Sequence, residues 1–312
     1  MVEAFSVPPV LLIAWRRPSA TKMVLEQIRK AAPSRLYIAC DGPSIDRPGE
    51  NDKVLAVREI IKKSIDWPCE VFTLYSDINQ GCRLGVVKAI NWFFENEDEG
   101  IILEDDCVPH SDFFVYCADL LERYRNDQRI WWISGTNAQN GHWRGDASYY
   151  ISKYGHCWGW ASWRSRWANL DSELSTLPAF LNSGLFISAL PDPKQRQYWA
   201  NVWTRLRNEG VPDAWDYRWT YSCISNGGLA IVPNRMLVSN VGFDSDATHT
   251  KQPYGQAGSY PSHPILPLSH PSFLLPDVDA DSFTFKHLYN LSFLQRLLIK
   301  LSRLRLFIFK DS

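Results

Sequence analysis

The chain lacks the features of a nucleic-acid-binding or zinc-finger protein. Its 312 residues carry a formal net charge of −1, so no basic excess exists to neutralise the phosphates of a duplex. The seven cysteines are odd in number and scattered, with no CxxC pair and no zinc-ligand spacing, which predicts reduced thiols. We therefore expect no nucleic-acid partner and no structural zinc.

Several other signatures are missing. Neither GxGxxG nor GxxxxGK[ST] occurs, which disfavours a classical dinucleotide fold and a P-loop. No apolar run approaches the roughly 20 residues of a membrane span. The apolar stretch Val10–Ala14 is too short for a secretory signal, and Arg16 and Arg17 follow it rather than precede it. We therefore expect a cytoplasmic location.

The last segment, residues 291–309, alternates Leu, Ile and Phe with Lys and Arg. This basic amphipathic pattern is compatible with peripheral contact at the inner face of the membrane, on an anionic surface. The alternative is a terminal helix packed on its own domain, with its basic side chains in water. The sequence leaves both readings open.

The first third of the chain alternates strand and helix signals. We expect strands at 10–14, 35–39, 70–75 and 100–103, and helices at 18–31, 52–64, 84–96 and 113–125. Short apolar strands separated by helices indicate βαβ units in a parallel sheet. Further strands are expected at 130–134 and 229–232, two helices within 171–208, and an irregular Pro-, Ser- and His-rich segment over 255–276. The fold class is thus α/β, with a mostly parallel central sheet flanked by helices.

The fourth apolar strand ends in three consecutive acids, Glu104, Asp105 and Asp106. Adjacent carboxylates at the end of a buried strand repel each other and lose hydration unless a cation or hydrogen-bond donors offset their charge. In an open parallel sheet ligands bind outside the carboxyl ends of the strands. The position therefore suits a hard divalent cation with bound phosphates, and the alternative is a solvated acidic turn.

Polar residues also follow the first two strands. Arg16 and Arg17 come after the first strand, and an arginine pair suits phosphate through bidentate hydrogen bonds. Asp41 follows the second strand beside a Gly-Pro turn and can accept hydrogen bonds from a base or ribose. Together with the three acids, these residues suit a sugar nucleotide. The alternative is that strand ends collect polar residues in any case.

Two acids in the second half, Asp213 and Asp216, are surrounded by large aromatic residues. Apolar walls make a carboxylate a better base, so either acid is a candidate catalytic residue. The alternative is a helix in which Trp215 and Trp219 pack into the core while Asp216 is solvated.

Histidines and tryptophans of the second half supply further candidates. His249 lies in a loop with acids and is a candidate metal ligand, although a lone histidine is more often a surface residue. Most of the crowded tryptophans at 158–167 are expected in the core, on one helical face. The step Gly159–Trp160 suits a pocket wall that stacks on a sugar, and His142 and His156, in the same Trp-rich loops, are candidates to touch one.

The segments 79–94 and 101–114 resemble GT-A glycosyltransferases, most closely the N-acetylglucosaminyltransferase I type. In that family a strand ends in Glu-Asp-Asp and a Pro-Asp-Phe-Phe helix follows, whereas here His110 and Ser111 separate Pro109 from Asp112. The likeness covers about residues 8–250. The stretch 242–250 is similar to bacterial relatives labelled haemolysin-like or sugar-nucleotide transferases.

The resemblance implies a role for each matching residue. Asp106 would be the direct ligand of Mn²⁺ or Mg²⁺, Asp105 would hold the ribose, and Glu104 would contact the donor sugar. Arg17 would contact the phosphates or base, and Asp41 would read a uracil edge, which favours a UDP-sugar. The family's catalytic base lies in a Trp-Asp-Asp-Trp segment, whose first acid matches Asp216. Tyr217 replaces the second acid, so Asp213 is the fallback.

The implied activity is that of a metal-dependent inverting glycosyltransferase of the hexosyltransferase type, acting on a glycan or lipid-linked acceptor. Residues 1–130 would bind the nucleotide sugar, 131–254 would form the Trp-rich acceptor half of the same domain, and 255–312 would form a linker and a helical, basic tail. The alternatives are a catalytically inactive sugar-binding or surface protein and a sugar-nucleotide nucleotidyltransferase. The second usually carries a Gly-rich basic loop, which this sequence lacks.

Overall fold

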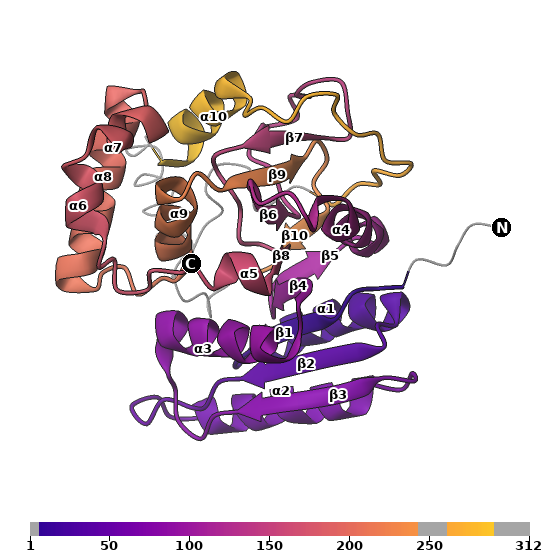
Figure 1. Ribbon diagram of the computed structural model, residues 1–312. Helices are drawn as coiled ribbons and strands as arrows, with labels where there is room; N and C mark the ends of the chain where they lie inside the picture. Colours follow the sequence, from indigo (N-terminus) through magenta and orange to yellow (C-terminus); the bar gives the residue numbers. More distant parts are fainter. Residues whose placement is uncertain (1–5, 243–260, 290–312) are drawn as a thin grey trace, which may run out of the picture.

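An eight-stranded sheet with the order β3-β2-β1-β4-β8-β6-β9-β7 forms the centre of the protein (Figure 1). The computed structural model describes residues 6–242 and 261–289. The strands of the sheet are β1 (Val10–Ala14), β2 (Arg35–Cys40), β3 (Glu70–Tyr75), β4 (Glu99–Glu104), β6 (Ile130–Ser134), β7 (Tyr149–Ser152), β8 (Trp160–Trp163) and β9 (Leu229–Pro233). A separate antiparallel pair consists of β5 (Cys107–Pro109) and β10 (Val238–Asn240).

Most strands of the large sheet run in the same direction. Strand β1 pairs in parallel with β2 and β4, β2 with β3, and β6 with β9. Strand β8 lies between β4 and β6 and is antiparallel to both, and β7 is antiparallel to β9. The predicted α/β fold class, with a mostly parallel sheet flanked by helices, is confirmed.

Helices cover both faces of the sheet. They are α1 (Pro18–Ala31), α2 (Glu50–Ser64), α3 (Gly81–Asn96), α4 (Ser111–Tyr124), α5 (Arg164–Trp167), α6 (Leu177–Leu181), α7 (Gly184–Ala189), α8 (Pro193–Glu209), α9 (Asp216–Ser225), α10 (Val278–Thr284) and the π-helical turn η2 (Phe285–Tyr289). The apolar sides of α1, α2 and α4 pack on one face, and those of α3, α5 and α9 on the other. Helices α6 to α8 form an outer layer beside α9 (Figure 1).

The sequence located the first four strands and helices well but misjudged the Trp-rich region. Trp160 and Trp163 belong to strand β8 rather than to a helix. All four residues of β8 are buried, because the strand is central and covered on both faces, so it lacks the alternation that marks a half-exposed strand. Residues 171–208 form three helices instead of two, since the five-residue α6 and six-residue α7 precede α8.

Five tryptophans attach α9 to the sheet. Their ring centroids lie 5.0–6.4 Å apart in eight neighbouring pairs, and each ring is at most 3% exposed. The members are Trp132, Trp160, Trp167, Trp215 and Trp219. Aromatic pairs of this kind stabilise by about 0.5–1.5 kcal/mol beyond the burial of their area. The cluster therefore fixes the start of α9 relative to the strands.

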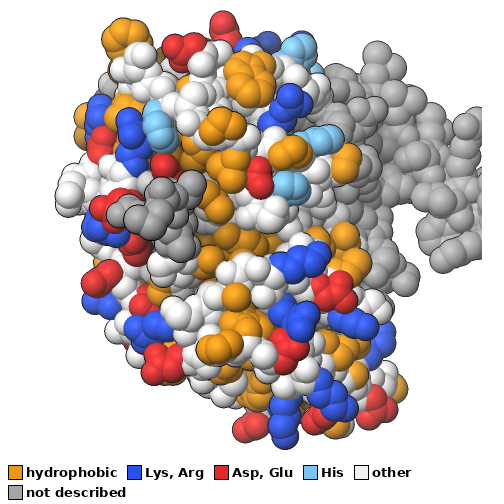
Figure 2. Space-filling view, turned by 90° about the vertical axis from the view of Figure 1, so that its right-hand side faces the viewer, with side chains coloured by type: hydrophobic (Ala, Val, Ile, Leu, Met, Phe, Trp, Pro, Cys, Tyr) orange, Lys and Arg blue, Asp and Glu red, His pale blue; other side chains and the backbone are white. Residues whose placement is uncertain are grey.

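No helix in 6–242 or 261–289 has both the length and the apolar character needed to cross a bilayer. Figure 2 shows one face of the molecule, on which acidic and basic side chains are intermixed. The basic segment 291–309 lies outside the described residues, so its membrane contact stays a prediction.

Arg166 gives a direct test of how α5 holds the sheet to α4. The buried guanidinium donates hydrogen bonds to the carbonyl oxygens of Tyr124, Arg125, Asp127 and Ile130. Arg166→Met removes these four bonds, although the carbonyl oxygens of Tyr124 and Asp127 also accept from the N–H groups of Asp127 and Ile130. We expect the free energy of unfolding to fall by about 2 kcal/mol. Urea denaturation measures the change.

Arg205 is the matched control, because its side chain is 59% exposed and pairs with Glu209 on the surface of α8. Arg205→Met should change stability by no more than about 0.5 kcal/mol. Equal losses in the two variants would contradict the role assigned to Arg166.

Candidate functional site

A cavity of about 610 Å³ lies where the strands β1 to β4 end. The register aligns Ile13 with Glu104, Ala14 with Cys40, and Cys40 with Tyr75. The residues that follow these strands therefore meet at one edge of the sheet. The rest of the lining comes from α3, from residues 155–158 and from residues 212–220 around the start of α9.

Most of the residues singled out in the sequence line this cavity. Those that do are Arg17, Asp41, Glu104, Asp105, Asp106, His156, Asp213 and Asp216. Arg16, His142 and Trp160 are not among the lining residues. His249 lies outside the described residues, so its assignment as a metal ligand stays a prediction.

Arg17 is the cation closest to the acids of β4. Its Nη1 lies 2.5 Å from Oδ2 of Asp106 and 3.4 Å from Oδ1 of Asp105. The backbone N–H of Trp15 also donates to Oδ2 of Asp105, at 3.0 Å. The residues directly after β1 therefore hold the acids that follow β4, as expected for neighbouring parallel strands.

Glu104 has no hydrogen bond or ion pair among the described residues, although it faces the cavity. Burial, with the neighbouring carboxylates of Asp106 and Asp105, raises the pKa of Glu104 to about 8. Burial and Asp106 raise the pKa of Asp105 to about 7, against the opposing effect of Arg17. A guanidinium alone therefore does not balance the charge of this group, and a further cation would stabilise its ionised form.

Asp106 is packed from behind by a segment far along the chain. Asn240, at the end of β10, donates a hydrogen bond from Nδ2 to Oδ1 of Asp106 at 3.3 Å. A Cβ atom at Gly242 would collide with the Asp106 carboxylate, so only glycine permits this approach. No local pattern in the sequence indicates either contact, because both depend on the pairing of β10 with β5.

Asp41 organises the loop before α3. Its carboxylate accepts hydrogen bonds from the backbone N–H groups of Gly42 and Gln80 and from Nδ2 of Asn79, at 2.9–3.0 Å. Burial raises the pKa of Asp41 against these opposing bonds. The loop contact accounts for much of its accepting capacity, which the sequence did not reveal.

Arg16 and Trp160 have positions in the fold that differ from the expected ones. Arg16 forms an ion pair with Glu50 at 2.9 Å and stacks over the ring of Trp15, so its partners lie on α2 and in its own segment. Trp160 is 1% exposed within the tryptophan cluster. The aromatic residues that line the cavity are Trp15, Trp132, Trp158, Trp215, Tyr217 and Tyr289.

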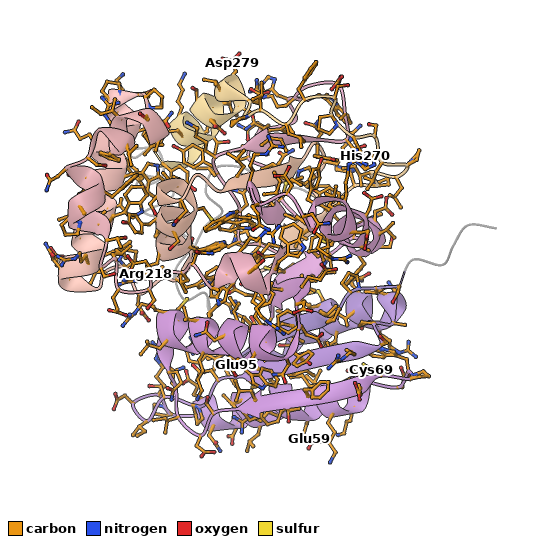
Figure 3. The ribbon with its side chains drawn as sticks, in the orientation of Figure 1. Glu59, Cys69, Glu95, Arg218, His270 and Asp279 are labelled. Carbon is orange, nitrogen blue, oxygen red and sulfur yellow. The ribbon has the colours of Figure 1, made fainter. Side chains whose placement is uncertain are left out.

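The start of α9 brings Asp216 into the cavity. Asp216 is the first residue of α9, and its Oδ2 lies 4.0 Å from Sγ of Cys157. Two residues further on, the buried Arg218, labelled in Figure 3, donates to the carbonyl oxygens of Ser172 at 2.5 Å and Leu206 at 3.1 Å. These bonds attach the first turn of α9 to the outer helical layer.

Asp213 has a more open environment than the acids of β4. Its side chain is 52% exposed, and its Oδ1 lies 3.9 Å from Nε of Arg83. A solvated carboxylate with a basic neighbour is a weaker candidate for proton abstraction than one enclosed by apolar walls. Asp216, which is only partly exposed and lies beside Cys157, has the more enclosed position.

The possible metal ligands of the cavity suit a hard divalent cation only in part. No group of three or more His, Cys, Asp or Glu side chains within 6–242 and 261–289 is arranged to hold a metal ion. Magnesium, however, is commonly held by one or two carboxylates together with substrate phosphates. Asp106 and Glu104 supply such oxygens and carry charge that Arg17 alone leaves unbalanced, so they fit a cation that arrives with a diphosphate.

Comparison with known proteins gives limited similarity. No family model matches the sequence, and no curated protein matches it. Among solved structures, the chain is similar to the mannosyltransferase PcManGT from Pyrobaculum calidifontis in complex with GDP-Man and Mn²⁺, with a TM-score of 0.40 and 11% identity over 72% of this chain and 70% of that one.

A second similar structure is HddC from Yersinia pseudotuberculosis, with a TM-score of 0.32 and 11% identity over 51% of this chain and 77% of that one. A third, a putative glucose-1-phosphate thymidylyltransferase from Bacillus anthracis in complex with a sucrose, has a TM-score of 0.30 and 9% identity over 60% and 77% of the two chains. Likenesses this low carry no argument about activity, which must come from the geometry of the site.

Glu104 predicts a characteristic pH dependence of stability. Because the pKa of Glu104 is raised to about 8 in the folded protein, its protonated form favours the fold. The associated stability is fully present below the pKa of about 4.3 in the unfolded chain and declines as pH rises toward 8. We expect Glu104→Gln to raise the melting temperature at pH 8 by more than about 2 °C in metal-free buffer, with little gain at pH 4.5.

Differential scanning calorimetry across pH 4.5–8 measures this effect. A gain that is equal at both ends of the range would contradict the raised pKa. Glu95→Gln, on α3 outside the cavity lining, is the control and should show no pH-dependent difference from the native chain.

Proposed function

We propose that the protein is a metal-dependent inverting glycosyltransferase that transfers a sugar from a nucleotide-diphosphate sugar to an acceptor hydroxyl. The observation that carries the proposal is the convergence of Asp106, Glu104, Arg17 and Asp216 on one cavity of about 610 Å³. A catalyst of this reaction must offset the charge of a departing diphosphate and remove a proton from the acceptor. The cavity contains residues suited to both tasks.

The donor side of the proposed site is built by the strand ends. Asp106, aided by Glu104, would bind a Mn²⁺ or Mg²⁺ ion, and a bound divalent cation neutralises the developing charge on the diphosphate. Arg17 would exchange part of its contact with the acids for the phosphates, since guanidinium binds both groups. Asp105 would hold the ribose, and Asp41 would lie at the base end, where we propose uracil.

The acceptor side carries the proposed base, Asp216. Its carboxylate would accept the proton of the acceptor hydroxyl as that oxygen attacks the anomeric carbon and the bond to the diphosphate breaks. Attack from the face opposite the leaving group inverts the anomeric configuration. Asp213 remains the second candidate for the base, since both acids line the cavity.

We propose that consecutive parts of the chain bind the donor and the acceptor. Residues 1–130 would hold the donor and 131–254 the acceptor, while 255–312 would form a linker and a basic tail. The acceptor is proposed to be a glycan or a lipid-linked glycan. An inactive sugar-binding protein is the alternative, and it predicts glycan binding without metal-dependent nucleotide binding.

Removal of the Asp106 carboxylate tests the donor side. We expect the native chain to bind UDP in isothermal titration with Mn²⁺ and to bind it at least about tenfold more weakly after metal removal by EDTA. Asp106→Asn should abolish that metal dependence, because the cation loses its direct ligand.

Asp98→Asn is the matched control, since the Asp98 side chain is 90% exposed and is not part of the cavity lining. It should bind UDP like the native chain. Metal-dependent UDP binding that survives in Asp106→Asn would remove Asp106 from the metal site, and absence of UDP binding in the native chain would favour the inactive sugar-binding alternative.

Substitution of the two candidate bases tests the acceptor side. Loss of a general base lowers the rate by about 10²–10⁴-fold, so Asp216→Asn should reduce kcat for sugar transfer by that factor while UDP affinity is kept. Asp213→Asn should reduce kcat by less than about tenfold, because its carboxylate is more open to solvent. Nucleotide release from a panel of UDP-sugars and acceptors measures both, and the reverse ranking would assign the base to Asp213.

A further inference from the structure

His156 is a polar residue of the cavity wall that the proposed reaction has not used. It lies on the segment 155–158, between β7 and β8, and lines the same cavity as Asp216. Its neighbour Cys157 places Sγ 4.0 Å from Oδ2 of Asp216. The imidazole therefore belongs to the wall that carries the proposed base.

Hydrogen bonds fix both the backbone N–H and the backbone carbonyl group of His156. Its N–H donates to Oγ of Ser134 at 3.0 Å, and its carbonyl oxygen accepts from Nε1 of Trp132 at 3.1 Å. A Cβ atom at Gly155 would collide with the Trp132 ring, so the chain reaches this position only with glycine there. The position of His156 is therefore fixed by β6 and by the tryptophan cluster.

One atom of the side chain, in contrast, is unpaired among the described residues. Nε2 of His156 is buried and makes no hydrogen bond with any described residue. A buried polar atom without a partner destabilises the unliganded protein, and a hydrogen bond from a ligand in the cavity would offset that cost. Burial also lowers the pKa of His156 to about 4, so the ring is neutral near pH 7, with one nitrogen that donates and one that accepts.

A neutral imidazole complements a hydroxyl, because a hydroxyl also donates and accepts. The partly exposed rings that line the cavity include Trp158 and Tyr217, and aromatic faces of this kind pack against the apolar face of a sugar ring. One hydrogen-bonding ring surrounded by aromatic walls is suited to a pyranose rather than to a phosphate, which would require a cation.

We propose that His156 binds a hydroxyl group of the acceptor sugar and orients it toward Asp216. The acceptor rather than the donor is assigned, because the next residue, Cys157, has its Sγ 4.0 Å from Oδ2 of Asp216, the proposed base. The ligand class is a hexopyranoside at the end of the acceptor. This inference rests on the proposed glycosyl transfer and specifies the acceptor subsite of that cavity.

The test uses the full chain with Mg²⁺ and UDP, and methyl α- and β-hexopyranosides of glucose, galactose and mannose as probes. Ligand-observed NMR gives the Kd of each glycoside, and isothermal titration gives the Kd of UDP. We expect at least one glycoside to bind the native chain. His156→Ala should raise the Kd of that glycoside by about tenfold, the effect of one lost hydrogen bond to a buried group. UDP affinity should change by less than about twofold.

Two further variants separate binding from folding. His156→Gln keeps a donor and an acceptor and should recover part of the glycoside affinity. His142→Ala, an exposed histidine outside the cavity lining, should leave it unchanged. In the native chain, ¹⁵N-histidine spectra should show a shift of the His156 ring nitrogens on addition of the glycoside.

The inference is overturned if no glycoside binds the native chain, if His156→Ala leaves glycoside affinity unchanged, or if it weakens UDP to the same extent. The last result would mark a structural role. Failure of the native chain to bind UDP would instead count against the proposed glycosyltransferase as a whole, so the two failures are distinguishable.

Discussion

The central constraint on this protein is the concentration of negative charge at the end of β4. Glu104, Asp105 and Asp106 lie on one enclosed turn, and within 6–242 and 261–289 their ion pairs are with Arg17 alone. The raised pKa values of Glu104 and Asp105 express the cost of that arrangement. A cavity that is lined by so much unbalanced negative charge is suited to bind a compensating ligand.

The sequence predicted which polar residues meet at the ends of β1, β2 and β4, because that arrangement is local in character. Short apolar strands followed by polar residues locate the ends of β1, β2 and β4, and parallel pairing alone brings Arg17, Asp41 and the acids together. Asn240 could not be found in this way, because it reaches Asp106 through the pairing of β10 with β5. Trp160 was misplaced for a related reason: a central strand that is buried on both faces gives no alternating pattern.

The acceptor side depends on the core rather than on local pattern. Trp215 and Trp219 pack into the tryptophan cluster, as one reading of the sequence held, and they carry Asp216 to the cavity at the first position of α9. Arg218 then attaches the same turn to α8. Stability and the position of the proposed base are therefore coupled, so a substitution in the cluster would alter both.

The antiparallel strand β8 has a consequence for synthesis of the chain. It is hydrogen-bonded to β4 on one side and to β6 on the other, so an emerging polypeptide that has completed β4 still presents an unpaired, apolar strand edge. The edge of β4 stays unpaired while about 60 further residues are synthesised. At a ribosomal rate of about 5–20 residues per second this takes roughly 3–12 s. A nascent chain stalled or truncated in this interval would be a substrate for chaperones, whereas one that reaches β8 covers the exposed edge of β4.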